Sequence, residues 1–257
     1  MNVAIFGGTF DPIHRGHLAI ARAAAERYKL GRIHFVPADI PPHKQKQPLT
    51  PYYHRLAMIA LAVQGEKNFV PSLLEAPEVI QAEGKLASYS IDTVRRFKEK
   101  LKKSDKLYFL IGIDAFMDIA KWRSPVELLH ECEFIVASRP GYSMADLARA
   151  LPEELRPEAQ VADIFRHQRA SGDLVLHGFT IHLLEDVNVP VSATKIRAAA
   201  ARKRSVAAMT NDAVAEYIRK ENLYLPEAEQ LPKAKSKEDP KPRMLTIVGG
   251  REHRKKK

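Results

Sequence analysis

The sequence Gly-Gly-Thr-Phe-Asp-Pro-Ile-His-Arg-Gly-His occupies residues 7–17 and follows directly on the apolar residues 3–6, Val-Ala-Ile-Phe. This order predicts a short buried strand, a glycine turn and a helix over residues 18–28. Gly7 and Gly8 let the backbone approach an anion closely, and a helix N-terminus presents unpaired N–H groups and the positive end of its dipole. These elements, in this order, predict a phosphate site in an α/β protein.

Two histidines sharpen this prediction. His14 and His17 are three residues apart, so they share one face of the predicted helix. Neutral imidazoles in that position can donate hydrogen bonds to phosphate oxygens without adding a full charge. A plainer interpretation gives the glycines only a turn and the histidines only a capping role. Strand, turn and helix together favour the phosphate site.

The composition indicates one globular domain in a reducing compartment. A chain of 257 residues can bury a substantial core, and single α/β domains often reach this length. Cys132 is the single cysteine, which excludes an internal disulfide. No apolar stretch approaches the roughly 20 residues that cross a bilayer, and no signal peptide is recognisable. We therefore expect a cytoplasmic protein with no membrane contact.

The formal charge of +10 is concentrated at the C-terminus. Residues 229–257 hold ten Lys and Arg against four Asp and Glu, a net +6, which leaves +4 for residues 1–228. We expect residues 1–228 to form the domain and residues 229–257, rich in Lys, Pro and Glu, to be a flexible basic tail, disordered at least in part. Because the charge lies in the tail, it gives little support to nucleic-acid binding.

Apolar runs alternate with helical patterns along the domain. The predicted strands are residues 3–6, 33–37, 107–112, 134–138 and 181–184, and the predicted helices are residues 18–28, 52–63, 90–101, 125–130, 193–201 and 211–222. This alternation predicts an α/β fold, a Rossmann-like doubly wound parallel sheet with helices on both faces. Ligands of such sheets bind beyond the carboxyl ends of the strands, where the candidate site residues are expected.

Residues 7–17 resemble the His-x-Gly-His signature of the nucleotidyltransferase superfamily, which also includes the class I aminoacyl-tRNA synthetases. The fuller form, Gly-Gly-Thr-Phe-Asp-Pro-x-His-x-Gly-His, is similar to nicotinate-nucleotide adenylyltransferases in particular. The resemblance implies that His14 and His17 contact the ATP phosphates and the charge that develops there. It also implies nucleotide contacts by the turn before them, at Gly7, Gly8, Thr9 and Phe10.

Two further motifs would bring charge to the nucleotide. Residues 41–44, Pro-Pro-His-Lys, place Lys44 on a loop stiffened by two prolines, where it can meet a triphosphate. Residues 191–197, Val-Ser-Ala-Thr-Lys-Ile-Arg, predict a helix that Ser192 caps, and they resemble the family's Ile-Ser-x-Thr-x-Ile-Arg motif. The resemblance assigns Lys44 and Arg197 to the triphosphate; Ser192 and Thr194 would also contact the nucleotide. Taken alone, each motif could be an ordinary surface loop or helix.

The remaining candidate residues would contact the ribose of the nucleotide or the second substrate, here called the acceptor. Gly112 and Asp114 follow a buried strand, and a carboxylate there can accept hydrogen bonds from a ribose hydroxyl. Trp122, the only tryptophan, is as readily explained by core packing as by a ligand. The resemblance implies that it stacks on a pyridine ring beside Arg123. Residues 88–93, Ser-Tyr-Ser-Ile-Asp-Thr, resemble the family's Ser-Tyr-Thr-x-x-Thr segment and nominate Ser90 and Thr93 for the acceptor.

The resemblance implies that ATP and nicotinate mononucleotide react to give deamido-NAD and pyrophosphate. Mg²⁺ would arrive on the ATP phosphates, so no dedicated metal site in the protein is expected. One alternative is a sister enzyme with the same ATP site and another acceptor: phosphopantetheine, glycerol phosphate with CTP, or nicotinamide mononucleotide. Residues 88–93 and Trp122 argue against the first two of these acceptors. A second alternative is a nucleic-acid-binding or regulatory protein without turnover, against which His14 and His17 argue. The sequence leaves a homo-oligomer open.

Overall fold

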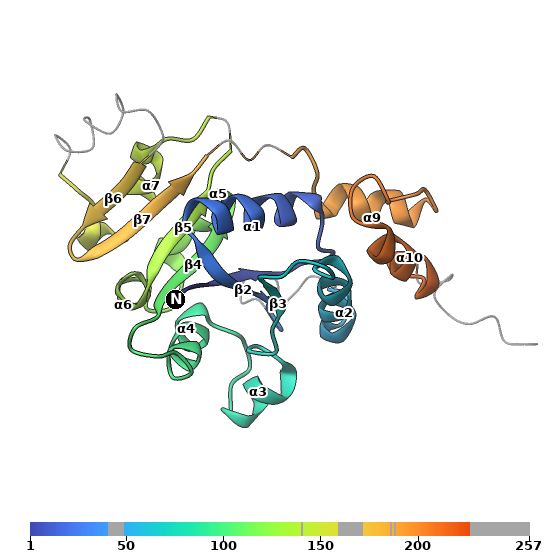
Figure 1. The fold of residues 1–257 in the computed structure, drawn as a ribbon, viewed down its shortest axis with the longest axis horizontal. Coiled ribbons are helices and arrows are strands. Elements are labelled where there is room, and N and C mark those ends of the chain that lie inside the picture. The colour runs from blue at the N-terminus through green and yellow to red at the C-terminus, as the bar shows by residue number, and fades with distance from the viewer. Residues whose placement is uncertain (41–48, 140, 159–171, 186, 188, 227–257) are drawn as a thin grey trace, which may run out of the picture.

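A computed structural model of the chain describes residues 1–40, 49–139, 141–158, 172–185, 187 and 189–226. Its centre is a sheet of seven strands in the order β3-β2-β1-β4-β5-β7-β6 (Figure 1). All neighbouring strands are parallel except β6 and β7, which form an antiparallel pair at one edge. The strands are β1 (Asn2–Gly8), β2 (Leu30–Pro37), β3 (Phe69–Pro71), β4 (Lys106–Gly112), β5 (Glu133–Ala137), β6 (Gly172–Leu176) and β7 (Phe179–Leu184).

Helices cover both faces of this sheet, as the alternating sequence pattern predicts. Two short 3₁₀ turns, η2 (Ile119–Lys121) and η3 (Glu153–Leu155), complete the described elements. The helices are α1 (Arg15–Arg27), α2 (Tyr52–Ala62), α3 (Pro77–Ala82), α4 (Ser90–Lys98), α5 (Ile113–Phe116), α6 (Pro125–Glu131), α7 (Met144–Ala150), α9 (Ala193–Ala201) and α10 (Asp212–Lys220). None of these helices is long and apolar enough to cross a membrane.

The alternating side chains of β1 separate two hydrophobic cores. Val3 and Ile5 pack with α4, α6 and α7 on one face of the sheet, whereas Ala4 and Phe6 pack with α1, α2, α9 and α10 on the other. All four side chains are nearly or fully buried. A central strand that is apolar on both faces is typical of a parallel sheet covered by two helical layers.

The strand order predicts a ligand crevice beside β1. The chain passes from β1 to β2 on one side and later returns to β4 on the other side, so the direction of winding reverses at this point. Open α/β sheets bind ligands outside the carboxyl ends of the strands at such a switch. Gly8 ends β1 and Gly112 ends β4, which brings two predicted nucleotide-binding segments to the same crevice.

The antiparallel edge is held by a buried histidine. On β7, His182 contacts Asp173 of β6 through Nδ1 at 2.6 Å and Glu133 of β5 through Nε2 at 2.7 Å. Each ring nitrogen faces a carboxylate oxygen of a different neighbouring strand. The contact joins three strands at the end of the sheet farthest from β3.

Candidate active site

The N-terminus of α1 is built by the two histidines. His14 is the N-cap, with an extended backbone at φ −147° and ψ 171°, so the helix begins at Arg15, three residues earlier than predicted. The backbone N–H of His14 donates to Nδ1 of His17 at 3.2 Å. An Nδ1 that accepts a hydrogen bond carries no proton, so in the neutral ring the proton lies on Nε2. This bond leaves His17 with its Nε2–H as the donor.

The two imidazole rings are stacked, with centroids 3.7 Å apart and planes inclined by 19°. Gly16, between them in sequence, makes this arrangement possible. A Cβ atom on Gly16 would lie 3.1 Å from Cε1 and Nδ1 of His14, a tight contact that would force the His14 ring to shift by a few tenths of an ångström. Gly16 was not among the predicted site residues, although its place within the His-x-Gly-His signature was a signal.

Both histidines are neutral at physiological pH. Burial, and after it the positive charge of Arg139, lower the pKa of His14 to about 4. Burial, followed by the charges of His14 and Arg139, holds the pKa of His17 well below its usual range. Nδ1 of His14 is buried and has no hydrogen-bond partner among the described residues. A buried polar atom in that state is costly, and a bound ligand or water would satisfy it.

The lowered pKa of His14 predicts a loss of stability in acid. The unfolded chain takes up a proton near pH 6.5, whereas the folded chain does so only near pH 4. The free energy of unfolding is therefore complete above about pH 6.5 and falls as pH falls towards 4, by up to about 3 kcal/mol from this residue. Urea unfolding at pH 7 and pH 4.5 should show a larger drop for wild type than for His14→Gln. An equal loss of unfolding free energy in the two proteins would contradict the lowered pKa of His14.

Phe10, a predicted nucleotide contact in the loop between β1 and α1, has a buried side chain. Phe10 has a left-handed backbone, with φ of 49°, and its ring is 2% exposed. The ring lies against Phe6, Phe35 and His17 with centroids 5.0 to 5.8 Å away. A Cβ on Gly8 would lie 3.0 Å from this ring. The phenyl group is part of the core, so only the main chain of Phe10 remains a candidate for nucleotide contact.

Asp11, which the sequence argument passed over, joins three distant segments to this loop. Its Oδ1 accepts from the Tyr224 hydroxyl at 2.8 Å, and its Oδ2 accepts from the Thr50 backbone N–H at 3.3 Å. Its carbonyl oxygen accepts from Nη1 of Arg197 at 2.7 Å. The carboxylate is 5% exposed and occupied by these donors, which gives it a structural role at the site.

A second helix N-terminus reaches the same loop. Ser192 caps α9, with its Oγ accepting from the Lys195 backbone N–H at 3.3 Å, as the sequence predicts. Thr194 is exposed in the first turn. Arg197, through its bond to Asp11, brings α9 to the loop that precedes α1, and Figure 1 shows α9 and α10 at the end of the molecule where α1 begins. Two helix N-termini therefore face one region of the molecule.

The ends of β4 and β5 add an ion pair. Asp114 follows β4, and its Oδ2 lies 2.9 Å from Nη1 of Arg139, which follows β5. Both side chains are more than half exposed, so the pair itself contributes little to stability. Arg139 acts electrostatically on His14 and His17, which places it near the phosphate site. Arg139 was not among the predicted site residues, although a basic residue directly after a predicted strand end was a signal.

The predicted acceptor-binding residues differ in whether their side chains can donate a hydrogen bond to a substrate. Ser90 begins α4 directly after Tyr89, and the guanidinium of Arg123 lies 4.7 Å above the Tyr89 ring. Trp122 is half-buried and contacts Phe109 edge to face at 6.3 Å. Thr93 is 1% exposed, and its hydroxyl donates to the buried carboxylate of Glu75 at 2.6 Å. Its donor is thus already used, which leaves Ser90 and Arg123 as the side-chain donors.

Some of the predicted site residues lie outside the described part of the chain. Lys44 and its proline-stiffened loop lie outside them, as does the predicted tail, residues 229–257. Within the described part of the chain, no three His, Cys, Asp or Glu side chains are grouped so that they could hold a metal ion. Gly112 caps α5 with open space around its Cα, so backbone approach by a ligand is unobstructed there.

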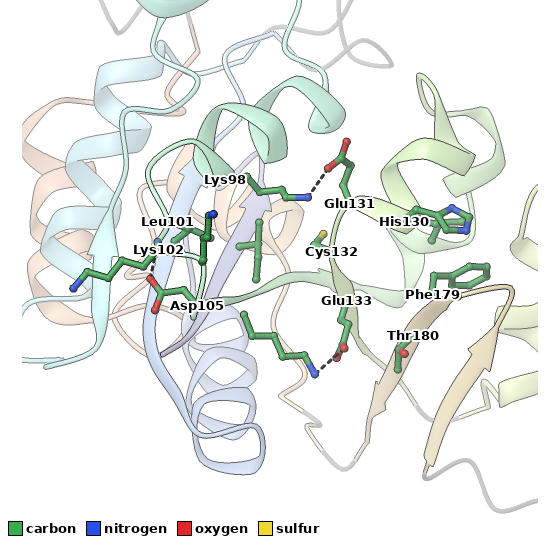
Figure 2. Close-up of a pocket in the computed structure, with 15 residues that line it drawn as sticks. Lys98, Leu101, Lys102, Asp105, His130, Glu131, Cys132, Glu133, Phe179 and Thr180 are labelled. Carbon is green, nitrogen blue, oxygen red and sulfur yellow. Dashed lines mark hydrogen bonds and ion pairs between the residues drawn. The ribbon is translucent and has the colours of Figure 1, made fainter.

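A separate cavity of about 500 Å³ lies at the opposite end of the sheet (Figure 2). Its walls include Lys106 and Glu133, which begin β4 and β5 and form an ion pair at 2.7 Å, and Phe179, which begins β7. None of the predicted site residues lines it. Because ligands of parallel sheets bind at the carboxyl ends of the strands, this cavity is not the candidate active site.

The fold, the crevice at the switch point and the two helix N-termini define a nucleotide-binding protein of the nucleotidyltransferase type. The chain belongs to the cytidylyltransferase-like family, whose sequence profile matches residues 5–199. Among its curated relatives, two proteins named probable nicotinate-nucleotide adenylyltransferase align over 224 residues, 87% of this chain. The protein of Pelobacter propionicus is 36% identical, with 98% of its length covered, and that of Moorella thermoacetica is 38% identical, with 92% covered.

The fold also has solved counterparts. The nicotinic acid mononucleotide adenylyltransferase of Plasmodium falciparum, solved in complex with NaAD, superposes with a TM-score of 0.63. The alignment covers 87% of this chain and 97% of that one at 18% identity. This likeness confirms the predicted Rossmann-like fold.

Proposed function

We propose that this protein is a nicotinate-nucleotide adenylyltransferase, which transfers the adenylyl group of ATP to nicotinate mononucleotide and releases pyrophosphate. The observation that carries the proposal is the convergence of α1 and α9 on the loop at the end of β1, through the contact of Arg197 with Asp11. Relatives of that name, which align over nearly their whole length, support the choice of substrates.

The chemistry follows from the site's donors. A phosphate oxygen of nicotinate mononucleotide attacks the α-phosphorus of ATP, a new P–O bond forms, and the bond to the β-phosphate oxygen breaks. The attacking phosphate is already anionic, so no general base is needed. The neutral imidazoles of His14 and His17 donate hydrogen bonds to oxygens on which charge develops, and Arg197 supplies a positive charge. Catalysis is then positioning and charge stabilisation.

Mg²⁺ is proposed to enter with ATP. The described side chains at the crevice are mostly nitrogen donors, imidazoles and guanidinium groups, whereas Mg²⁺ prefers oxygen ligands. This donor set fits an ion held by phosphate oxygens and water rather than by a carboxylate cage. When bound, the ion would neutralise charge on the pyrophosphate that leaves.

Pyrophosphate release with a panel of acceptors tests the proposed function. The purified full chain is mixed with Mg²⁺ and either ATP or CTP. The acceptors are nicotinate mononucleotide, nicotinamide mononucleotide, phosphopantetheine and glycerol 3-phosphate. Release with ATP and nicotinate mononucleotide, with deamido-NAD as the second product, is the expected result. Release only with another pair would identify a sister enzyme, and none with any pair would favour a protein without turnover.

Replacing Arg197 should impair the use of ATP in particular. Arg197→Ala removes a charge and the hydrogen bond to the Asp11 carbonyl, and charge-assisted contacts to phosphate are among the stronger ones in proteins. We expect kcat/KM for ATP to fall about tenfold to a hundredfold. Arg202→Ala, at the C-cap of the same helix, is the matched control. An unchanged dependence on ATP in a folded Arg197→Ala protein would return Arg197 to a structural role.

A further inference from the structure

Arg55, in the first turn of α2, is the largest of the fully buried side chains among the described residues, with 1% of its surface exposed. A buried guanidinium is costly unless its N–H groups are satisfied. Among the described residues no carboxylate bonds to it directly, and its hydrogen bonds go to backbone carbonyl oxygens. Burial lowers its pKa, and the nearby carboxylates of Asp11 and Asp39 oppose that effect.

Four carbonyl groups from three segments converge on this side chain. Nη1 donates to Thr9 at 2.9 Å and to Ala38 at 2.6 Å. Nη2 donates to Asp39 at 3.1 Å, and Nε donates to Thr50 at 2.8 Å. Thr9 belongs to the loop that leads to His14 and His17. Ala38 and Asp39 follow β2, and Thr50 precedes α2.

The direction of these bonds fixes the direction of the neighbouring N–H groups. In a trans peptide, the N–H of one residue points opposite to the C=O of the residue before it. The Thr9 carbonyl points at Arg55, so the Phe10 N–H points to the other side of the loop. The same holds for the Asp39 N–H, which follows the Ala38 carbonyl. By holding these two carbonyl groups, Arg55 orients the Phe10 and Asp39 N–H groups away from itself.

We propose that Arg55 is a positioning residue for the ATP site: it fixes the loop after β1, the turn after β2 and the residue before α2 relative to one another. The proposal rests on the proposed function for the identity of the nucleotide. It does not make Arg55 a contact of the substrate, because the side chain is enclosed on all sides.

The effect of losing this residue should differ between the two substrates. Ser90, Trp122 and Arg123, the predicted acceptor residues, have no hydrogen bond or ion pair with Arg55 among the described interactions. A misplaced β1–α1 loop should therefore raise KM for ATP and lower kcat, while KM for nicotinate mononucleotide changes little. A residue needed only for folding would instead reduce the active fraction, which lowers apparent kcat and leaves both KM values unchanged.

Two graded variants and one control test the proposal. Arg55→Lys keeps a charge but cannot span four carbonyls, and Arg55→Gln keeps a short donor without charge. Ile59→Ala, one turn along the same helix and fully buried, loosens α2 without removing any of the four bonds. Each protein is assayed at a temperature where circular dichroism shows it folded. Affinity for MgATP is measured by calorimetry, which requires no turnover.

We expect Arg55→Lys to bind MgATP at least tenfold more weakly than wild type, Arg55→Gln more weakly still, and Ile59→Ala within threefold of wild type. KM for nicotinate mononucleotide should stay within threefold in every folded variant. Equal effects of Arg55→Lys and Ile59→Ala on MgATP affinity would overturn the proposal. So would failure of both Arg55 variants to fold while Ile59→Ala folds, since Arg55 would then serve the fold alone. Wild type that binds MgATP but gives no product would count against the proposed function and not against this comparison.

Discussion

His17→Asn is expected to lower kcat at least about a hundredfold while leaving the protein folded, because it removes one preorganised donor to the reacting phosphates. The amide oxygen of asparagine can replace Nδ1 of His17 as acceptor for the His14 backbone N–H, a bond of 3.2 Å in the structure. What it cannot replace is the Nε2–H on the far side of the ring. His17→Ala should lose a similar amount of activity and more stability, since it removes both.

The comparison separates capping from catalysis. Steady-state kinetics at saturating ATP and nicotinate mononucleotide give kcat, and thermal melts give the stability of each variant. His130→Ala is the control, because His130 is also hydrogen-bonded on a helix but lines the cavity at the opposite end of the sheet. Near-normal kcat in folded His17→Asn would refute the catalytic assignment and leave His17 as a helix cap.

Nicotinate mononucleotide should be preferred over nicotinamide mononucleotide by a factor of about a hundred or more in kcat/KM. The two substrates differ by a carboxylate against an amide, and a site that supplies only donors leaves the amide N–H₂ without a partner. Ser90 and Arg123 remain as donors, since the hydroxyl of Thr93 is bonded to Glu75. Trp122 offers a flat ring edge-on to Phe109, against which a pyridine ring could stack.

Initial rates with each mononucleotide at a fixed, saturating ATP concentration measure this preference. Arg123→Gln should reduce it, because the charge is lost while hydrogen-bonding groups remain. Arg95→Gln on α4, whose guanidinium pairs with Glu127 and Glu131 at the surface, is the matched control. Equal rates with the two substrates in wild type would make this an enzyme of dual specificity.

The fold was largely predictable from local patterns. The five predicted strands are present because each is mostly apolar and mostly buried; residues 107–111 of β4, for example, are buried throughout. The short β3 and the edge strand β6 were missed. Three residues of β3 are too few to show a period. In β6 exposure alternates but residue type does not, because the apolar Val175 lies on the exposed side with Asp173.

The site was predictable only where one stretch of sequence carries it. Ser192 is the N-cap that its motif predicts, and His14 and His17 lie at the start of α1, directly after the predicted strand and turn. Asp11, Arg55 and Arg139 were missed because their contacts join residues far apart in sequence. Phe10 shows the converse: its place in a motif suggested a ligand contact, whereas its ring completes the core beside Phe35. The catalytic and binding roles of the site residues stay predictions until the variants are assayed.

The contacts of Asp11 determine when during synthesis the site can be completed. β1 can pair with β2 once residue 37 has left the ribosome, but the partners of Asp11 are residues 50, 197 and 224. At the roughly 5–20 residues per second of translation, the last partner follows the first by many seconds. A ribosome-bound chain that has formed its central strands therefore still lacks the fixed loop. The loop that carries Asp11 can be fixed by all three partners only after residue 224 has been made.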